Sequence, residues 1–330
     1  MPSDFTQLDW SPAIEDDLRQ IVRLAVREDL DRFHDWTTLS IVDADQEGRA
    51  VVVVRKPGVI AGLRALPIVI DEMHAAIDVE LEAADGDDVA AGSTVATLSG
   101  SARDLLVCER PLLNLLGHLS GIATRTREFV RAIDGTKARI YDTRKTIPGW
   151  RRLEKYAVRC GGGHNHRTGL YDAVLIKDNH LALFAGEDVA DEQLTPADAV
   201  RRAQDFLRET ASQRDNASDG PSDGPSDGPS DYGDMLVEIE IDKLSQLDDV
   251  LAAGPDIVLL DNMRPDDLRA AVERRNASAP AIELEASGGV NLSTVRAIAE
   301  TGVDRISVGE ITHSAPALDV ALDWLPAKSR

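Results

Sequence analysis

Six short apolar runs in the second half of the chain constrain its fold more than any other feature. Each run ends in polar residues, as in ARIYDTRK, AVLIKDN, MLVEIEID, DIVLLDN, AIELEASGG and RISVGE. Segments of helical composition separate several of the runs, at 243–253, 265–276 and 291–301. Short, continuously apolar strands that alternate with helices are typical of parallel sheets covered on both faces. The pattern therefore predicts a parallel α/β sheet or barrel.

The ends of these predicted strands carry charged residues or glycine. In α/β barrels the active site lies at the carboxyl ends of the strands. We therefore expect a functional site built from those ends, with candidates Arg144 and Lys145, Lys177, Glu240, Asp261, Ser287 to Gly289, and Gly309.

The first hundred residues follow a different pattern. Apolar residues at helical spacing predict a helix over 12–29, and strand-like runs lie at 49–58 and 93–100. This order indicates an α+β domain that ends near Gly100. A leucine-rich face then predicts a long helix or a helix pair over 104–133.

A repeat, SDGPSDGPSDGPSD, occupies residues 218–231 between a predicted helix near 196–210 and the strand-like run at 235–241. Its composition is rich in Gly and Pro and too poor in apolar residues to order itself. We expect a flexible surface loop with the character of a linker, which the surrounding fold tolerates.

Charge is spread unevenly along the chain. The net charge is −22, which argues against binding nucleic acid or an anionic membrane through the overall field. Residues 101–177, however, hold 15 basic and 7 acidic side chains. This basic segment can bind an anion, or its charges can pair with acidic neighbours. We interpret the acidic remainder as a solvated surface that keeps the protein soluble, as in a salty cytoplasm.

Cysteine content and apolar runs bear on the cellular compartment of the protein. Its two cysteines, Cys108 and Cys160, form no disulfide framework and fit a reducing cytoplasm. No apolar run reaches the roughly 18–20 residues that a membrane-spanning helix needs, and MPSDFTQLDW has no signal-peptide pattern. We expect a cytoplasmic protein.

The stretch from 142 to 180 is dense in basic side chains. Guanidinium groups bind carboxylate or phosphate in a bidentate manner, and Lys supplies a mobile point charge. Three glycines at 161–163 allow the backbone to approach a ligand or turn sharply. A zinc site at Cys160, His164 and His166 is disfavoured because no second pair at metal spacing follows. The stretch therefore predicts an anion site.

Two late glycine motifs, at 287–289 and 308–310, each follow a predicted strand and precede a helix. Backbone N–H groups at such positions bind phosphate. Glu240 and Asp261 end neighbouring strands, where carboxylates can hold ribose hydroxyls or Mg²⁺. Alternatively, Glu238 and Glu240 are buried or paired structural carboxylates. The combined inventory is typical of a phosphoribosyltransferase; a Schiff-base lyase using Lys177 would need fewer arginines.

Several longer motifs resemble the quinolinate phosphoribosyltransferase family, also called nicotinate-nucleotide pyrophosphorylase (carboxylating). They are ERPLLNLLGHLSGIAT, YDTRKTIPGWRRLEKYAVRCGGGHNHRTGLYDAVLIKDNH, VEIEIDKLSQLDDVL, IVLLDNM, LEASGGV and GVDRISVGEITHSAPALD. The resemblance implies an N-terminal α/β sandwich domain over 1–120, joined by the C-terminal segment 312–330. It implies an incomplete, TIM-like α/β barrel over 121–311, in which 215–233 forms the low-complexity loop.

The resemblance also implies a pentosyltransferase reaction in NAD biosynthesis. Quinolinate and phosphoribosyl pyrophosphate (PRPP) would give nicotinate mononucleotide, pyrophosphate and CO₂, with Mg²⁺ as cofactor held by Glu240 and Asp261. Lys145, Lys177, Glu240 and Asp261 would be catalytic. Arg110 would reach the site of a neighbouring subunit in a homodimer, with a hexamer left open. Substrate binding would use these same residues together with Thr143, Arg144, His166, Arg167, Ser287, Gly288, Gly289, Val308, Gly309 and Glu310.

Two features depart from the family pattern. The segment EDLDRFHDWTT lacks the glycine of the family's EDLxxGD, and the SDGP repeat enlarges the segment before Glu240. Competing hypotheses are a related phosphoribosyltransferase acting on another aromatic acid and a non-catalytic binding protein of the same pathway. The presence of every candidate arginine and carboxylate disfavours both.

Overall fold

The structure, a computed structural model, describes residues 4–184, 194–215 and 235–326, so the SDGP repeat lies outside the described residues. The chain divides into two compact units. The parallel-sheet unit contains residues up to Thr6, Arg131–Arg144 and Asn165–Val308. The antiparallel-sheet unit contains Gln7–Val130, Lys145–His164 and the segment from Gly309 onward.

The parallel-sheet unit contains all six strands expected from the apolar runs. Their order in the sheet is β6-β11-β10-β9-β8-β7, and every pair of neighbours is parallel. The strands are β6 (Arg139–Tyr141), β7 (Val174–Ile176), β8 (Val237–Ile241), β9 (Ile257–Asp261), β10 (Glu283–Ser287) and β11 (Arg305–Ser307). The predicted parallel α/β class is confirmed.

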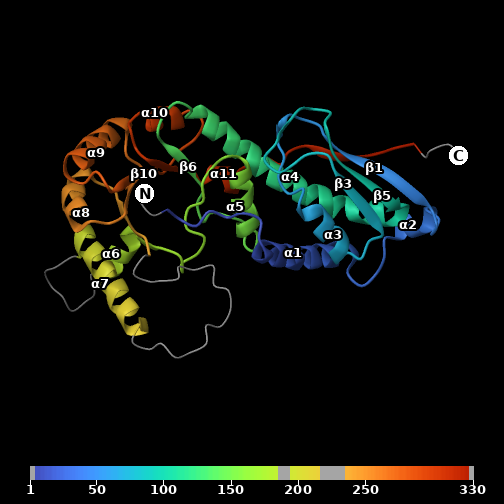
Figure 1. Cartoon of the computed structure of the whole chain (residues 1–330), viewed down its shortest axis with the longest axis horizontal. Helices are drawn as coiled ribbons and strands as arrows, with labels where there is room; N and C mark the ends of the chain where they lie inside the picture. Colours follow the sequence, from blue (N-terminus) through green and yellow to red (C-terminus); the bar gives the residue numbers. More distant parts are fainter. Residues whose placement is uncertain (1–3, 185–193, 216–234, 327–330) are drawn as a thin grey trace. The chain divides into compact units, whose positions relative to one another are not determined.

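Helices alternate with these strands. They are α6 (Asp178–Phe184), α7 (Pro196–Asp215), the 3₁₀ turn η2 (Leu244–Gln246), α8 (Leu247–Ala253), α9 (Pro265–Ser278) and α10 (Val295–Ala299). Figure 1 shows α8, α9 and α10 in succession along the outer side of the strands. Among the described residues β6 and β7 are the two edge strands of the sheet. Strand pairing thus leaves the sheet open, and its closure into an incomplete barrel stays a prediction.

The antiparallel-sheet unit is built on a four-stranded sheet of order β12-β1-β5-β3. These strands are β1 (Glu47–Val54), β3 (Ile77–Leu81), β5 (Thr94–Ser101) and β12 (Val320–Trp324); β2 (Gly58–Val59) and β4 (Asp88–Val89) form a separate pair. The last strand of the chain therefore pairs with the first. The helices are α1 (Pro12–Leu30), α2 (Trp36–Ile41), α3 (Ala65–Glu72), α4 (Ala102–Ala132), α5 (Arg151–Cys160) and α11 (Glu310–His313).

Helix α4 is one continuous helix, which decides between the single helix and the helix pair left open by the sequence. The expected domain boundary at residue 120 falls inside it, and residues 145–164 group with the antiparallel-sheet unit instead of the barrel. A Cβ at Gly121 would lie 2.2 Å from the carbonyl oxygen of Pro316. Glycine there lets the C-terminal segment lie directly against the helix backbone.

Helix α1 ends within the EDLDRFHD segment, although this segment lacks the glycine of the family motif. Helix α1 ends at Leu30, and Asp31 takes a left-handed φ of 49°, which Asp tolerates better than most residues. Phe33 is exposed, and Asp35 caps α2 by accepting from the backbone N–H of Thr38 at 3.0 Å. In the part of the chain that the structure describes, no helix is long and apolar enough to cross a membrane.

Candidate active site

The carboxyl ends of the six parallel strands bring the predicted site residues of the parallel-sheet unit, except His166 and Arg167, to one edge of the sheet. Lys177 directly follows β7, Asp261 and Ser287 are the last residues of β9 and β10, and Glu240 precedes the last residue of β8. The remaining members at this edge are Thr143 and Arg144 after β6, Gly288 and Gly289 after β10, and Val308 after β11. Arg110, Lys145, Gly309 and Glu310 belong to the antiparallel-sheet unit.

Arg167 is the most strongly desolvated cation among these residues. Arg167 is 7% exposed, and its Nη1 donates to the carbonyl of Ala173 at 3.3 Å. Burial, followed by the like charge of Arg144, lowers the pKa of Arg167 below its usual range. A bound anion would stabilise the charged form of a guanidinium that burial and a like charge both disfavour. The buried Arg167 therefore suits a carboxylate or a phosphate as its ligand.

His166, next to Arg167, is fixed by hydrogen bonds on its backbone and ring. Its backbone N–H donates to Asp142 at 2.8 Å, and its Nδ1 accepts from the backbone N–H of Arg167 at 2.8 Å. Because a backbone N–H can only donate, Nδ1 carries the lone pair and the ring proton is on Nε2. His166 is therefore a neutral imidazole that can donate only through Nε2.

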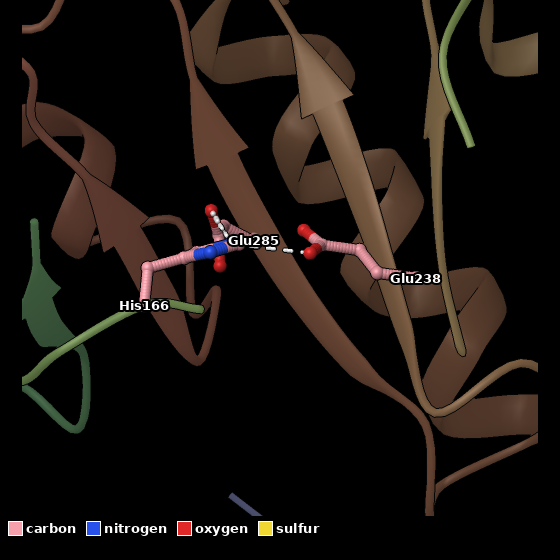
Figure 2. A group of neighbouring side chains, drawn as sticks. All are labelled: His166, Glu238 and Glu285. Atoms are coloured by element: carbon pink, nitrogen blue, oxygen red, sulfur yellow. Dashed lines mark ion pairs between the residues drawn. The ribbon is translucent and has the colours of Figure 1, made fainter. Parts of the chain in front are cut away.

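Two buried glutamates face that nitrogen. The Nε2 atom lies 3.1 Å from Glu238 Oε2 and 3.5 Å from Glu285 Oε1, and Figure 2 shows the imidazole pointing toward both carboxyls. Burial raises the pKa of Glu238 and of Glu285 to about 7. The three groups are close enough to hold a metal ion. The tautomer argues against it, because a protonated Nε2 offers no lone pair to a metal.

Lys177 and Glu240 form an ion pair at the same edge of the sheet. Lys177 is half-buried and Glu240 is mostly buried. From the sequence, one interpretation held that Glu238 and Glu240 are buried or paired carboxylates. In the structure Glu240 is paired and Glu238 is fully buried. An ammonium group in an ion pair has no lone pair with which to attack a carbonyl. The pairing favours a binding role for Lys177 over a Schiff-base role.

Glu240 and Asp261 suit the Mg²⁺ that the sequence led us to expect. Glu240 pairs in register with Leu259, so Asp261, two residues further along β9, points to the same face of the sheet as Leu259. Asp261 Oδ2 accepts from the side-chain amide of Asn262 at 2.8 Å, which leaves further oxygen lone pairs for a cation. Carboxylate oxygens are the ligands that Mg²⁺ prefers.

In the loop after β10 the backbone comes close to the neighbouring loop after β9. Gly288 and Gly289 have φ values of 90° and 59°. A Cβ on Gly288 would lie 2.3 Å from Asn262 Oδ1, while the Asn262 backbone N–H donates to the carbonyl of Ser287 at 2.9 Å. The loops after β9 and β10 are therefore interlocked, and glycine is required by both the dihedral angle and the available space.

Replacement of Gly288 by Ala is expected to lower the free energy of unfolding by about 1–3 kcal/mol, since it forces a strained φ and an overlap with Asn262. Affinity for phosphorylated ligands should fall as the loop shifts. Chemical denaturation and equilibrium binding of PRPP measure the two effects. Gly92→Ala is the matched control because Gly92 also has a positive φ, of 85°, but no atom within 4 Å of its Cβ position. Equal losses of affinity in both variants would contradict the prediction.

The predicted site residues of the antiparallel-sheet unit have their own contacts. Lys145 packs against Gly309, whose Cβ position lies 3.1 Å from Lys145 Cδ, and the Lys145 carbonyl accepts from Thr312 Oγ1 at 2.8 Å. Glu310 accepts from Arg125 Nε at 3.0 Å, so its side chain is already engaged. Any phosphate contact at 308–310 would therefore come from the backbone. Arg110 is exposed on α4 and pairs with Glu109 at 2.7 Å.

Sequence reasoning missed three residues that organise the site. Asp142 is fully buried, and its carboxylate accepts from Asn165 Nδ2 at 2.8 Å as well as from His166. Glu285 lies two residues before Ser287 and could have been placed on the same face by strand alternation. Phe5 stacks on His166 with ring centroids 4.2 Å apart, and no local signal in the sequence indicates that contact.

A parallel α/β sheet that carries Arg144, Lys177, carboxylates and a tight glycine loop at its carboxyl edge places this chain in a class: α/β proteins whose ligand sites lie at the strand ends. The family models for quinolinate phosphoribosyl transferase match this chain, the N-terminal domain over residues 35–120 and the C-terminal domain over 122–212 and 230–323. The chain belongs to the quinolinate phosphoribosyltransferase family.

Individual relatives agree with that assignment. The chain is 42% identical over 311 residues to the nicotinate-nucleotide pyrophosphorylase (carboxylating) of Mycobacterium leprae, covering 93% of this chain and 97% of that relative. It is 38% identical to a probable enzyme of the same name from Bacillus subtilis, covering 88% and 87%. The solved nicotinate-nucleotide pyrophosphorylase of Francisella tularensis superposes with a TM-score of 0.78 at 32% identity, covering 98% of this chain and 100% of that one.

Proposed function

We propose that this protein transfers the phosphoribosyl group of PRPP to quinolinate with loss of CO₂, giving nicotinate mononucleotide and pyrophosphate in NAD biosynthesis. The names of its relatives support this activity. The observation that carries it is the burial of Arg167, whose Nη1 donates to the carbonyl of Ala173. Because quinolinate has two adjacent carboxylates, it suits a site with desolvated guanidinium groups.

The residues at the sheet edge then have distinct tasks. Arg144 and Arg167 hold quinolinate, and the neutral His166 fixes the backbone beside them. Glu240, paired with Lys177, would stabilise the positive charge that develops on the ribose as pyrophosphate leaves. Lys177 supplies positive charge toward the pyrophosphate. Glu240 and Asp261 would hold Mg²⁺, which neutralises charge on the leaving group.

Decarboxylation requires no further catalytic group. Once its nitrogen is ribosylated, the pyridine ring carries a positive charge that stabilises the carbanion left by departing CO₂, and a proton from solvent then takes the place of the lost carboxylate. The arginines keep the remaining carboxylate in place. We therefore expect no covalent ribosyl-enzyme intermediate, and trapping one on Asp or Glu would contradict the mechanism.

The direct test incubates the purified protein with quinolinate, PRPP and Mg²⁺ in high salt and measures CO₂ and nicotinate mononucleotide. Both products should form in equal amounts, and EDTA should abolish them. Nicotinate in place of quinolinate should give neither. Turnover of another aromatic acid but not of quinolinate would instead identify a related phosphoribosyltransferase.

We also propose a homodimer in which Arg110 enters the neighbouring subunit's site, with assembly to a hexamer as a further possibility for sedimentation to test. The exposure of Arg110, at 62% of its side chain, supports this role. Arg110→Ala and Lys177→Ala should each be inactive alone. The two variants can be mixed, unfolded and refolded together, so that half of the dimers contain one subunit of each kind. If the sites are shared, each mixed dimer has one intact site of two. The mixture should then recover about a quarter of wild-type activity. No recovery would contradict a shared site.

A cytoplasmic location remains part of the proposal. Cys108 and Cys160 are both free, and burial raises the pKa of each thiol to about 12. Thiols held in this way are poorly reactive, which suits a protein without structural disulfides.

A further inference from the structure

The N-terminal residues Asp4 and Phe5 are part of the parallel-sheet unit, although the next stretch of the chain, Gln7–Val130, belongs to the other unit. Asp4 Oδ1 accepts from Arg305 Nη1 at 2.8 Å. Asp4 Oδ2 accepts from the hydroxyl of Tyr141 at 2.9 Å and from Arg139 Nη1 at 3.2 Å. Arg139 and Arg305 are the first residues of β6 and β11, so Asp4 is anchored at the amino edge of the sheet.

This anchor places Phe5 inside the unit. Phe5 is 4% exposed and shares a buried cluster with residues of the sheet and its flanks, namely Tyr141, Ala173, Leu236 and Ile257. Its ring lies against the imidazole of His166, with centroids 4.2 Å apart and planes 30° apart. The N-terminal segment therefore contacts a residue that belongs to the proposed quinolinate site.

The His166 ring has a single orientation that suits all of its neighbours. In that orientation Nδ1 accepts from the backbone N–H of Arg167, and Nε2 faces Glu238 and Glu285. Rotating the ring would break the first contact and turn a carbon toward the carboxyls. Without Phe5 one face of the imidazole would adjoin a cavity, and rotation would no longer be opposed by packing.

We propose that Phe5 is a positioning residue for quinolinate binding: its ring holds His166 in the orientation that fixes the Arg167 backbone and thereby aims the Arg167 guanidinium. The inference rests on the proposed function for the identity of the ligand. It also assigns a role to a segment that precedes both family matches, the first of which begins at residue 35.

The role predicts selective loss of quinolinate affinity. Phe5→Ala should raise the Kd for quinolinate roughly tenfold or more, because a misplaced guanidinium loses its bidentate geometry. The Kd for PRPP should change less than about twofold, since Phe5 stacks on His166, which is proposed to act at the quinolinate side of the site. Calorimetric titration of the full-length protein with each ligand measures both constants.

The matched control is Leu268→Ala on α9, a fully buried site of the same unit that lies outside the Phe5 cluster. It should lower the melting temperature without changing the ratio of the two Kd values. Phe5→Leu, which keeps most of the apolar volume, guards against a variant that fails to fold, and it should still raise the quinolinate Kd several-fold. Unchanged quinolinate affinity in Phe5→Leu, or equal weakening of both ligands, would overturn the positioning role.

A spectroscopic measurement separates this inference from the proposed function. In ¹⁵N-histidine spectra of the protein without ligand, assigned with His166→Gln, His166 should show an unprotonated Nδ1 and a protonated Nε2. Phe5→Leu should shift or broaden these signals, and Leu268→Ala should not. If wild type fails to bind quinolinate but the signals respond to Phe5, the proposed function fails and the positioning contact stands. A wild-type spectrum with metal-bound Nε2, or signals unaffected by Phe5→Leu, would overturn the inference.

Discussion

Replacing Arg167 by Met is expected to lower kcat/KM for quinolinate on the order of 10³-fold. Met keeps much of the length of the side chain but removes the charge and the guanidinium fork. The Arg167 side chain is buried, and desolvation together with Arg144 destabilises its charged form. Its interaction with a bound carboxylate is therefore made in a setting with little water to weaken it.

The controls for this prediction come from the chain itself. Arg167→Lys retains the charge but loses bidentate geometry and should fall between wild type and Arg167→Met. Arg201→Met removes an exposed arginine of α7, paired with Asp198 at 2.8 Å, and should leave kcat/KM unchanged. Steady-state kinetics at saturating PRPP measures each. An Arg167→Met variant within tenfold of wild type would exclude Arg167 from the quinolinate site.

Replacing Arg305 by Met is expected to destabilise the parallel-sheet unit by about 3–5 kcal/mol. Arg305 is 1% exposed, pairs with Asp4 at 2.8 Å and forms a second ion pair with Glu283. Its guanidinium also lies over the rings of Phe5 and Tyr141, 5.4 and 4.7 Å from their centroids. The substitution would remove the buried cation shared by Asp4 and Glu283, leaving Arg139 as their remaining cationic partner, and would weaken the hold on the N-terminal segment.

Urea denaturation, followed by a probe in the parallel-sheet unit, measures the loss. Arg269→Met serves as the control, since Arg269 forms an exposed pair with Asp266 within α9 and its loss should change stability by less than about 0.5 kcal/mol. A destabilisation by Arg305→Met below about 1 kcal/mol would show that the anchor of Asp4 contributes little. If the anchor matters, Arg305→Met should also weaken quinolinate binding through Phe5.

Local sequence patterns predicted the elements of the catalytic sheet because strand length, burial and polar ends are recorded within a few neighbouring residues. The run DIVLLDN becomes β9 with Asp261 at its end, and AVLIKDN becomes β7 followed by Lys177. Placing both at one edge required only that the strands be parallel, which short apolar runs separated by helices indicate. The length of α4 was harder to predict, because leucines at helical spacing suit one helix or two equally well.

Patterns along the chain were enough to predict the class of the fold, the six strand ends and the arginines, carboxylates and glycines of the candidate site. The contacts among side chains became known from the folded chain: Lys177 pairs with Glu240, Glu238 and Glu285 face His166, and Phe5 packs on its ring. The two kinds of information differ in the range of the interactions behind them. Periodicity and capping act between neighbours in the chain, whereas packing of buried groups joins residues as distant as Asp4 and Arg305.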